Sequence, residues 1–489
     1  MPFTPDWESV KTHAVPDWYH DAKLGVFLHW GPYSVPAWAP QVPDIPTILR
    51  EHGPKWLLRN NPYAEWYLNT MQFAGSPTER HHRETYGEGY PYDRFAEQFA
   101  ESSADADLDA LADLCRRAGA RYVVLTTKHH DGFCLWPSSI EHPAKGRYHS
   151  TRDLVGDTTA AVRAAGMRMG LYYSGGFDWP FNDARIAGLA DLATGVPQSN
   201  EYVAYCETHL RELIERYEPS VLWNDIACPY GLDLAALFAD YYNAVPDGVV
   251  NDRWTQSKPG GRALTASVRA GGAAVQALWR FVPAKYKQIN IAQRVPHVDF
   301  RTPEYAQHDE IAEKKWESTR GVGHSFGANR HERAEDIVTA TDLVRSFVDI
   351  VSKNGNLLIG IGPEPDGTIP GWQAAPLLGL GEWLATNGEA VFGTRPWTIA
   401  ESKTHDGTQV RFTQRDEQLY ATLLETPASR RIEFPGLDAH GVESVDVLGL
   451  DETPEWGATG GRVHIELPER LPVSPALVVR LRPTPQPAA

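Results

Sequence analysis

Short apolar runs and amphipathic stretches alternate along most of this 489-residue chain, and this alternation most limits its fold. Residues 219–225 (PSVLWND) show the unit best, because an apolar run leads into Asn224 and Asp225 between helical patterns at 201–217 and 232–245. A short apolar run bounded by turn residues predicts a buried strand. Strand-then-helix units repeated in this way predict an α/β protein with a parallel sheet.

Polar and aromatic residues follow several of the predicted strands directly. α/β barrels keep their catalytic groups at these positions, at the C-terminal ends of the strands. We therefore predict a (β/α)8-like barrel, and no glycine-rich dinucleotide or phosphate loop favours a nucleotide-binding fold instead. The other predicted strands are 22–31, 121–126, 167–173, 249–251 and 356–361.

From about Trp397 the hydrophobic pattern changes to period two, which predicts a small antiparallel β-sandwich. The predicted organisation is a catalytic barrel over 1–390 with an inserted stretch around 255–298, then a sandwich over 396–483 and a tail over 484–489. A connection as long as the inserted stretch is usually a functional loop or an insertion. The strands expected in the sandwich are 410–412, 419–424, 431–434, 442–448, 463–467 and 477–481.

Composition argues against several classes of protein. The net charge of −17 argues against a nucleic-acid partner, because neutralising phosphates requires clustered Lys and Arg. No apolar run approaches the length of a membrane span. The N-terminal residues lack the basic-then-apolar pattern of a signal peptide, and the four cysteines lack metal-like or paired spacing. We therefore expect a cytoplasmic protein with reduced thiols and no membrane partner.

The chain is rich in aromatic residues, with 16 Trp and 20 Tyr, and many of the Trp lie beside His, Pro and Gly. In a cleft such rings offer a flat face to the C–H face of a sugar, whereas in a core they are ordinary packing. We expect both uses here, for different residues.

Hydrolysis of a glycosidic bond needs two carboxyl groups, one to attack or to activate water and one to protonate the leaving oxygen. Asp225 and Glu304 are the best pair, with Glu65 as the second choice of partner. Each of the two has a structural alternative. Asp225 could cap a loop or the next helix, and the Thr-Pro-Glu motif at 302–304 resembles a helix start, followed by a helical stretch at 310–316.

The adjacent residues His129 and His130 suggest a metal site as one interpretation. Neighbouring residues on a strand point to opposite faces, so the two cannot easily bind one ion unless the strand has ended. No H-x-H or H-x-x-x-H motif accompanies them. Hydrogen bonding to sugar hydroxyls is the interpretation that we favour, and a metal-dependent barrel enzyme stays as an alternative.

Several segments together resemble the α-L-fucosidase family of glycoside hydrolases. The most specific are the His-Trp-Gly block at the end of 18–31 and the block KHHDGF at 128–133. The resemblance covers nearly the whole chain, including Gly-Asn-Leu-Leu at 355–358 and the terminal β domain. The other matching segments are 33–36, 65–67, 127, 171–174, 222–225, 251–254 and 316–317.

The resemblance implies a retaining exo-glycosidase that removes terminal α-L-fucose from fucosylated oligosaccharides or glycosides. Asp225 matches the nucleophile of the family, and Glu304 looks like its acid/base. No metal and no cofactor are implied. The matching positions that line the fucose pocket are His29, Glu65, Trp66, His129, His130, Tyr172 (with Tyr173 as the alternative), Trp223 and Arg253.

Two other functions stay open beside this one. A non-catalytic fucose-binding protein on the same scaffold is the first, and the presence of Asp225 counts against it. Hydrolysis of a related sugar is the second. The inserted stretch 255–298 departs from the compact bacterial form and could reach a neighbouring subunit, so a homo-oligomer also stays open.

Overall fold

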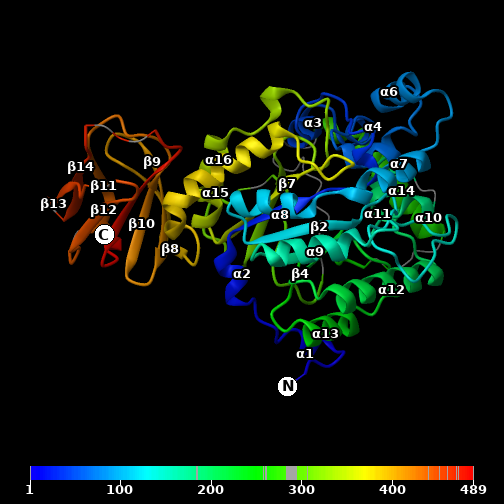
Figure 1. Ribbon diagram of the computed structural model, residues 1–489, viewed down its shortest axis with the longest axis horizontal. Helices are drawn as coiled ribbons and strands as arrows, with labels where there is room; N and C mark the ends of the chain where they lie inside the picture. Colours follow the sequence, from blue (N-terminus) through cyan, green and yellow to red (C-terminus); the bar gives the residue numbers. More distant parts are fainter. Residues whose placement is uncertain are drawn as a thin grey trace.

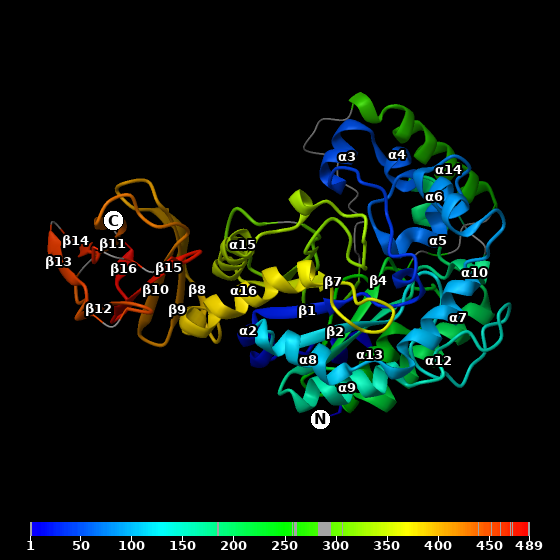
Figure 2. The same cartoon turned by 45° about the horizontal axis from the view of Figure 1, so that its top comes forward.

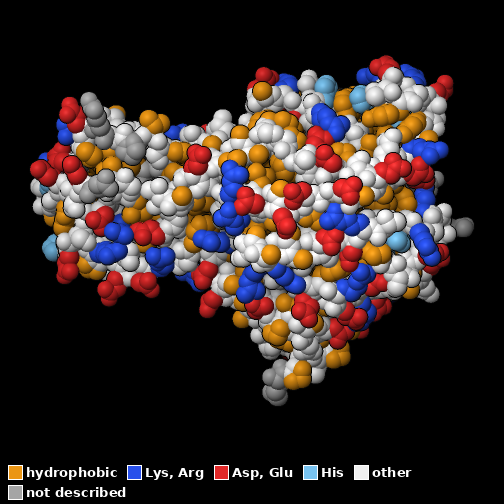
Figure 3. Space-filling view, viewed as in Figure 1, with side chains coloured by type: hydrophobic (Ala, Val, Ile, Leu, Met, Phe, Trp, Pro, Cys, Tyr) orange, Lys and Arg blue, Asp and Glu red, His pale blue; other side chains and the backbone are white. Residues whose placement is uncertain are grey.

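The computed structural model describes residues 2–487, except 183–184, 257, 259–261, 282–294, 306, 439, 451, 460, 470 and 472. A large β/α part and a smaller part made of antiparallel strands lie side by side along the longest axis (Figure 1). The smaller part projects from one side of the larger, and Asp and Glu side chains are interspersed with Lys and Arg over the visible face (Figure 3).

Within the described residues, seven parallel strands form one curled sheet in the order β5–β4–β3–β2–β1–β7–β6. The strands are buried on both faces, which is why most of them read as apolar runs and not as an alternation. They are β1 (Leu24–Leu28), β2 (Tyr122–Lys128), β3 (Arg168–Ser174), β4 (Val221–Asp225), β5 (Val249–Val250), β6 (Trp316–Gly321) and β7 (Gly355–Ile361).

The gap between the edge strands β5 and β6 is filled by the irregular segment 299–305. On one side the Asp299 N–H donates to the carbonyl of Val250 in β5 at 3.1 Å. On the other side the segment runs parallel to β6, with isolated bridges at Arg301 and Glu304. The segment therefore takes the place of an eighth strand, and the predicted (β/α)8-like barrel is confirmed.

Long helices pack on the outside of the sheet, and side chains cap several of their N-termini. Asp107, Asp153, Ser199, Asp233 and Thr339 each accept a bond from the N–H three residues later. The long helices are α8 (Leu108–Arg117), α9 (Leu154–Ala164), α12 (Asn200–Tyr217), α13 (Leu234–Ala244), α15 (Ala340–Ser352) and α16 (Gly371–Asn387). Across the described part of the chain, no helix combines the length and apolar character needed to span a membrane.

Further helices form the N-terminal segment and the connections around the barrel. They are α1 (Trp7–Val10), α2 (Asp17–Ala22), α3 (Ile45–Glu51), α4 (Pro54–Arg59), α5 (Tyr67–Thr70), α6 (Pro77–Tyr86), α7 (Asp93–Ser102), α10 (Trp179–Asn182) and α11 (Leu189–Thr194).

Part of the predicted insertion forms α14 (Arg262–Ala277) and a 3-10 turn, η4 (Trp279–Phe281). The indole N–H of Trp279 donates to the Leu49 carbonyl at 2.6 Å, and its ring packs into the apolar cluster formed by α3 and α4. This part of the insertion therefore lies against those two helices (Figure 2). Residues 282–294 of the predicted insertion lie outside the described residues.

The C-terminal part contains antiparallel sheets around a core of its own. One sheet has the order β12–β15–β10–β9–β8 and another the order β13–β14–β11–β16. Alternate side chains face this core, as Val445 and Val447 do in β12. The predicted antiparallel part is confirmed, and Gln486–Pro487, in the predicted tail, pairs with β11. The strands are β8 (Arg395–Lys403), β9 (Gln409–Arg415), β10 (Gln418–Leu423), β11 (Arg431–Asp438), β12 (Ser444–Val447), β13 (Glu455–Thr459), β14 (Arg462–Glu466), β15 (Leu477–Arg482) and β16 (Gln486–Pro487).

The predicted helical stretch at 310–316 is wrong. Residues 311–315 contain no helix, and Trp316 begins β6. Most of the residues 310–314 are exposed, including Ile311. The stretch therefore buries little apolar surface, and a short helix in a protein depends on such burial for its stability.

Candidate active site

The candidate site residues from the sequence lie together in one cavity at the C-terminal end of the barrel strands. Strand ends and the connections that follow them supply these residues, as the barrel prediction requires. The predicted residues in the lining are His29, Glu65, Trp66, His129, His130, Tyr172, Trp223, Asp225, Arg253 and Glu304. The lining also includes Phe27, Tyr63, Ile226, Thr319 and Phe326.

Asp225 is the last residue of β4 and lines the cavity with an exposed fraction of 8%. Its Oδ1 accepts bonds from Nη1 of Arg253 at 2.9 Å and from the Ile226 N–H at 2.8 Å. Its Oδ2 accepts from the Tyr172 hydroxyl at 2.8 Å. The next long helix is capped by Asp233, so Asp225 is not a helix cap, and its donors hold the carboxylate in one orientation.

Arg253 connects Asp225 to Glu304. Its Nη1 lies 2.9 Å from Oδ1 of Asp225 and 2.7 Å from Oε1 of Glu304. Two oxygens held by one nitrogen at those distances are at most about 5.6 Å apart. That limit lies below the roughly 6.5–9.5 Å of inverting glycosidases and leaves room for the separation of about 5–5.5 Å in retaining ones.

The guanidinium of Arg253 is also held from its other side. Thr302 accepts from Nε through its hydroxyl and from Nη2 through its carbonyl, each at 2.9 Å. Burial acts to lower the pKa of Arg253, but the charges of Glu304 and Asp225 outweigh burial and raise the pKa. Arg253 is therefore a fixed positive charge between the two carboxylates.

His29, His129 and His130 face the cavity as neutral rings. The strand β2 ends at Lys128, so the two adjacent histidines are no longer held on opposite faces, and their ring centroids lie 4.1 Å apart. Burial lowers the pKa of all three well below the usual value. Nδ1 of His130 bonds with the Ser174 hydroxyl at 2.7 Å. Among the described residues, the buried Nδ1 atoms of His29 and His129 have no hydrogen-bond partner, although both rings line the cavity.

Aromatic rings form the walls of the cavity. Tyr172 and Trp223 stack with ring centroids 5.5 Å apart and planes 25° apart. Trp66 belongs to a 3-10 turn, η2 (Ala64–Trp66), and lines the cavity from another side. The neighbouring Tyr173 bonds through its hydroxyl to a histidine in the core outside the sheet. The alternation of side chains along β3 therefore selects Tyr172.

Glu65 is almost fully buried, with an exposed fraction of 2%. Its Oε2 accepts from the Gly327 N–H at 2.9 Å and from the Ser325 hydroxyl at 3.2 Å. Burial raises the pKa of Glu65 to about 7. The hydrogen bonds of Glu65 hold the loop at 325–327, whereas Glu304 and Asp225 both contact the Arg253 cation. Glu304 is thus the better partner for Asp225 on geometry.

The helix start proposed for 302–304 and the metal site proposed for the histidine pair do not fit the structure. No helix begins at 302–304, where the backbone bridges to β6 instead. The adjacent His129 and His130 do not belong to any group of three potential metal ligands among the described residues. The pair is therefore better explained as hydrogen-bonding groups of the cavity than as a metal centre.

Sequence reasoning missed part of the lining. Phe27 and Thr319 lie inside strands, where an inward position could have been inferred from alternation. Tyr63, which donates to Oε2 of Glu304 at 3.4 Å, and Phe326 come from connections without a pattern. Ile226 has φ of 69°, a conformation that β-branched residues rarely adopt, and no sequence signal marks it.

Two carboxylates held at this spacing on the rim of a barrel place the protein in the class of glycoside hydrolases. A family model described as alpha-L-fucosidase matches residues 1–389. The chain therefore belongs to the α-L-fucosidase family, as its motifs indicated, and the comparisons support α-L-fucosidase function.

Curated and solved relatives agree with this membership. Tissue alpha-L-fucosidase of Rattus norvegicus is 31% identical over 93% of this chain and 86% of its own. The Homo sapiens protein of the same name is 30% identical over 96% of this chain and 89% of its own. The crystal structure of Thermotoga maritima alpha-fucosidase with a mechanism-based inhibitor is 39% identical, covers 98% of this chain and 100% of its own, and has a TM-score of 0.82.

The prediction of a cytoplasmic location is wrong. The mammalian tissue α-L-fucosidases, which match more than nine-tenths of the chain, are lysosomal and not cytoplasmic. The pattern of the first residues therefore does not assign a compartment within this family. All four cysteines are free and buried, which is compatible with more than one redox environment.

Proposed function

We propose that this protein removes terminal α-L-fucose from fucosylated glycans or glycosides, with Asp225 as nucleophile and Glu304 as acid/base. The observation that carries the proposal is the shared cation: one nitrogen of Arg253 contacts both carboxylates. Their spacing favours attack by a carboxylate over attack by water, which would need a wider gap.

In the first step Asp225 attacks the anomeric carbon and Glu304 gives a proton to the leaving oxygen. A fucosyl-enzyme ester forms with the configuration inverted. In the second step Glu304 takes a proton from water, the water attacks the anomeric carbon, Asp225 leaves as a carboxylate, and the configuration is inverted again. The two steps together release fucose with net retention.

The remaining lining residues would bind the sugar. The rings of His29 and His129 line the cavity and suit ring hydroxyls, because a hydroxyl can either donate to or accept from a neutral ring. Trp66 would cover the apolar side of fucose, which carries the C6 methyl group of the sugar. No step of this mechanism uses a metal or a cofactor.

We also propose the domain boundaries 1–390, 396–483 and 484–489, with 255–298 as the insertion. The family model ends at 389 and the C-terminal strands have a separate core, which supports the first boundary. A homo-oligomer that uses the insertion is part of the same proposal. Light scattering of a variant without 255–298 tests it, and an unchanged mass would contradict it.

Hydrolysis of an aryl α-L-fucoside, followed by proton NMR of the first product, tests the function. We expect α-L-fucose to appear before its β-anomer, and Asp225→Asn to abolish turnover. The aryl β-L-fucoside and the aryl α-L-galactoside serve as controls for the anomer and for the C6 methyl group. Binding of fucose without turnover would favour the non-catalytic alternative, and faster turnover of the galactoside would favour a related sugar.

A further inference from the structure

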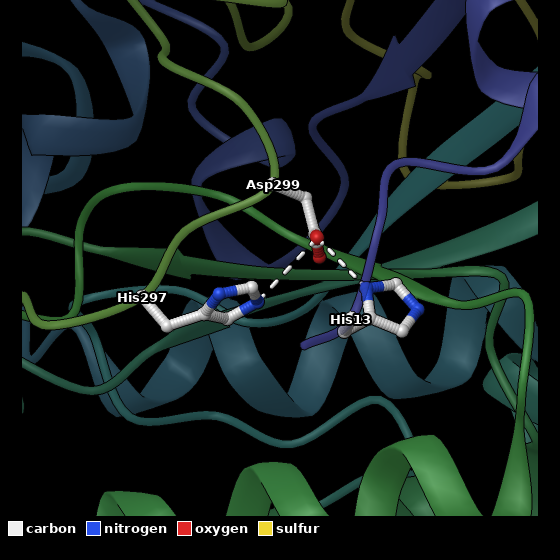
Figure 4. A group of neighbouring side chains, drawn as sticks. All are labelled: His13, His297 and Asp299. Atoms are coloured by element: carbon white, nitrogen blue, oxygen red, sulfur yellow. Dashed lines mark hydrogen bonds and ion pairs between the residues drawn. The ribbon is translucent and has the colours of Figure 1, made fainter. Parts of the chain in front are cut away.

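His13, His297 and Asp299 converge on one point beside β5, outside the catalytic cavity (Figure 4). Nδ1 of His13 lies 2.9 Å from Oδ1 of Asp299, and Nε2 of His297 lies 3.5 Å from the same oxygen. Among the described residues they are the one group of three or more His, Cys, Asp or Glu whose donor atoms all lie within 4.8 Å of one another. The side chains of His13 and Asp299 are 4% and 1% exposed.

Short contacts hold the donor atoms of the three side chains close together. Nδ1 of His13 bonds with Oδ1 of Asp299 at 2.9 Å, and Nε2 of His297 bonds with the Tyr242 hydroxyl at 2.9 Å. A metal ion would take the place of the protons in these contacts, because a histidine binds a metal through a nitrogen that carries no proton.

We propose that His13, His297 and Asp299 bind a divalent transition-metal ion, with zinc as the best match. Two imidazoles and one carboxylate are a donor set that zinc takes in proteins, at about 2.0–2.2 Å from each atom. Tetrahedral coordination at that distance separates neighbouring donors by about 3.4 Å. The two nitrogen–oxygen distances, 2.9 and 3.5 Å, lie on either side of that value.

Neighbouring groups hold the proposed ligands in place through hydrogen bonds. The Tyr242 hydroxyl and the Val250 N–H both donate to Oδ2 of Asp299 at 2.8 Å, which leaves Oδ1 free for the ion. The Pro246 carbonyl orients His13 through its other nitrogen. Outer bonds of this kind fix the tautomer and the direction of metal ligands.

The position of this site indicates a structural role. His13 lies in the N-terminal segment between α1 and α2, and Asp299 begins the segment that closes the barrel between β5 and β6. The ion would join these two segments, which are far apart in sequence. Glu304 lies five positions after Asp299 in the same segment, so the ion would also fix the start of the segment that presents Glu304.

Metal analysis of the full chain, purified without chelator from zinc-supplemented medium, tests the proposal. We expect about one zinc per chain in the wild type, and a loss of at least about tenfold in His13→Ala and in His297→Ala, because even outer-shell changes cost 10- to 100-fold in affinity. The matched control is His440→Ala, which removes an exposed histidine that contacts Asp438 at 2.6 Å and should leave the zinc content unchanged.

A second measurement separates loss of metal from loss of folding. Zinc added to metal-stripped protein should raise the Tm of the wild type by several degrees and leave that of His13→Ala unchanged. His13→Cys should retain zinc, because a thiolate is a zinc ligand. Wild type without bound metal and without a zinc-dependent Tm would overturn the proposal. Full zinc content in the His13→Ala/His297→Ala double variant would overturn it as well, and neither result bears on hydrolysis of fucosides.

Discussion

The Nη1 atom of Arg253 lies 2.7 Å from Oε1 of Glu304, in a pair whose side chains are 14% and 36% exposed. The same nitrogen reaches Asp225 at 2.9 Å. One partly buried cation therefore limits the distance between the proposed nucleophile and the proposed acid/base. Because Thr302 holds that cation from behind, the spacing of the carboxylates depends on the segment that closes the barrel.

Replacement of Arg253 by lysine should lower kcat/KM by about 100-fold, which corresponds to roughly 3 kcal/mol. A lysine ammonium is a single point charge and cannot hold both carboxylates and both Thr302 oxygens at once. Steady-state kinetics on an aryl α-L-fucoside measures the effect. The matched control is Arg211→Lys, on the outer face of α12, where the arginine pairs with Glu207 and Asp240. A loss no larger than that of the control would contradict the role of Arg253.

Replacement of His29 by leucine should separate stability from activity. The free energy of unfolding should change by less than about 1 kcal/mol, because the substitution removes a buried nitrogen that has no partner among the described residues. kcat/KM should fall by about 10- to 100-fold, since a bond to a ring hydroxyl is lost. His52→Leu, at a side chain that is 42% exposed, is the control. Unchanged kinetics in His29→Leu would remove this residue from the sugar site.

Glu65 should make the protein less stable as the pH rises from 4.5 to 7. The folded state raises the pKa of Glu65 from an ordinary 4.5 to about 7. In that window the unfolded chain ionises Glu65 while the folded protein keeps the proton, so stability is lost with rising pH. The shift corresponds to roughly 3 kcal/mol.

Glu65→Gln removes this titration and should flatten the pH dependence of the free energy of unfolding by up to roughly 3 kcal/mol between pH 4.5 and 7. Urea unfolding of both proteins at several pH values measures it. Burial also raises the pKa of Asp131 and of Glu332 to about 7, but these groups act equally in both proteins. Parallel curves for the variant and the wild type would show that Glu65 is not protonated in the folded state.

The strands were predictable wherever burial on both faces gave a continuous apolar run, as in β1, β4 and β7. β6 was missed because its sequence, Trp-Glu-Ser-Thr-Arg-Gly, is polar although most of it is buried. Glu317 shows the reason: tertiary partners, the hydroxyls of Tyr19 and Tyr122, satisfy its carboxylate inside the barrel. Such pairing over long sequence separations leaves no local pattern.

Some residues of the candidate site could be predicted from the sequence, and other features of the structure could not. Residues at strand ends, such as Asp225 and His29, could be found because the barrel fold makes those positions converge. The φ of Ile226 and the cluster of His13 with Asp299 could not be found, because the first is a backbone conformation and the second joins residues 286 positions apart. Only coordinates reveal either feature.

The most direct test of the central claim is the configuration of the fucosyl azide that each carboxylate variant forms from an aryl α-L-fucoside. Asp225→Gly with azide should give β-fucosyl azide, because azide replaces the nucleophile in a single inversion. Glu304→Ala should give α-fucosyl azide, because azide attacks the fucosyl-enzyme in a second inversion. Full activity in Glu304→Ala would move the acid/base role to Glu65 or elsewhere. α-Fucosyl azide from Asp225→Gly would contradict the assignment of Asp225 as the nucleophile.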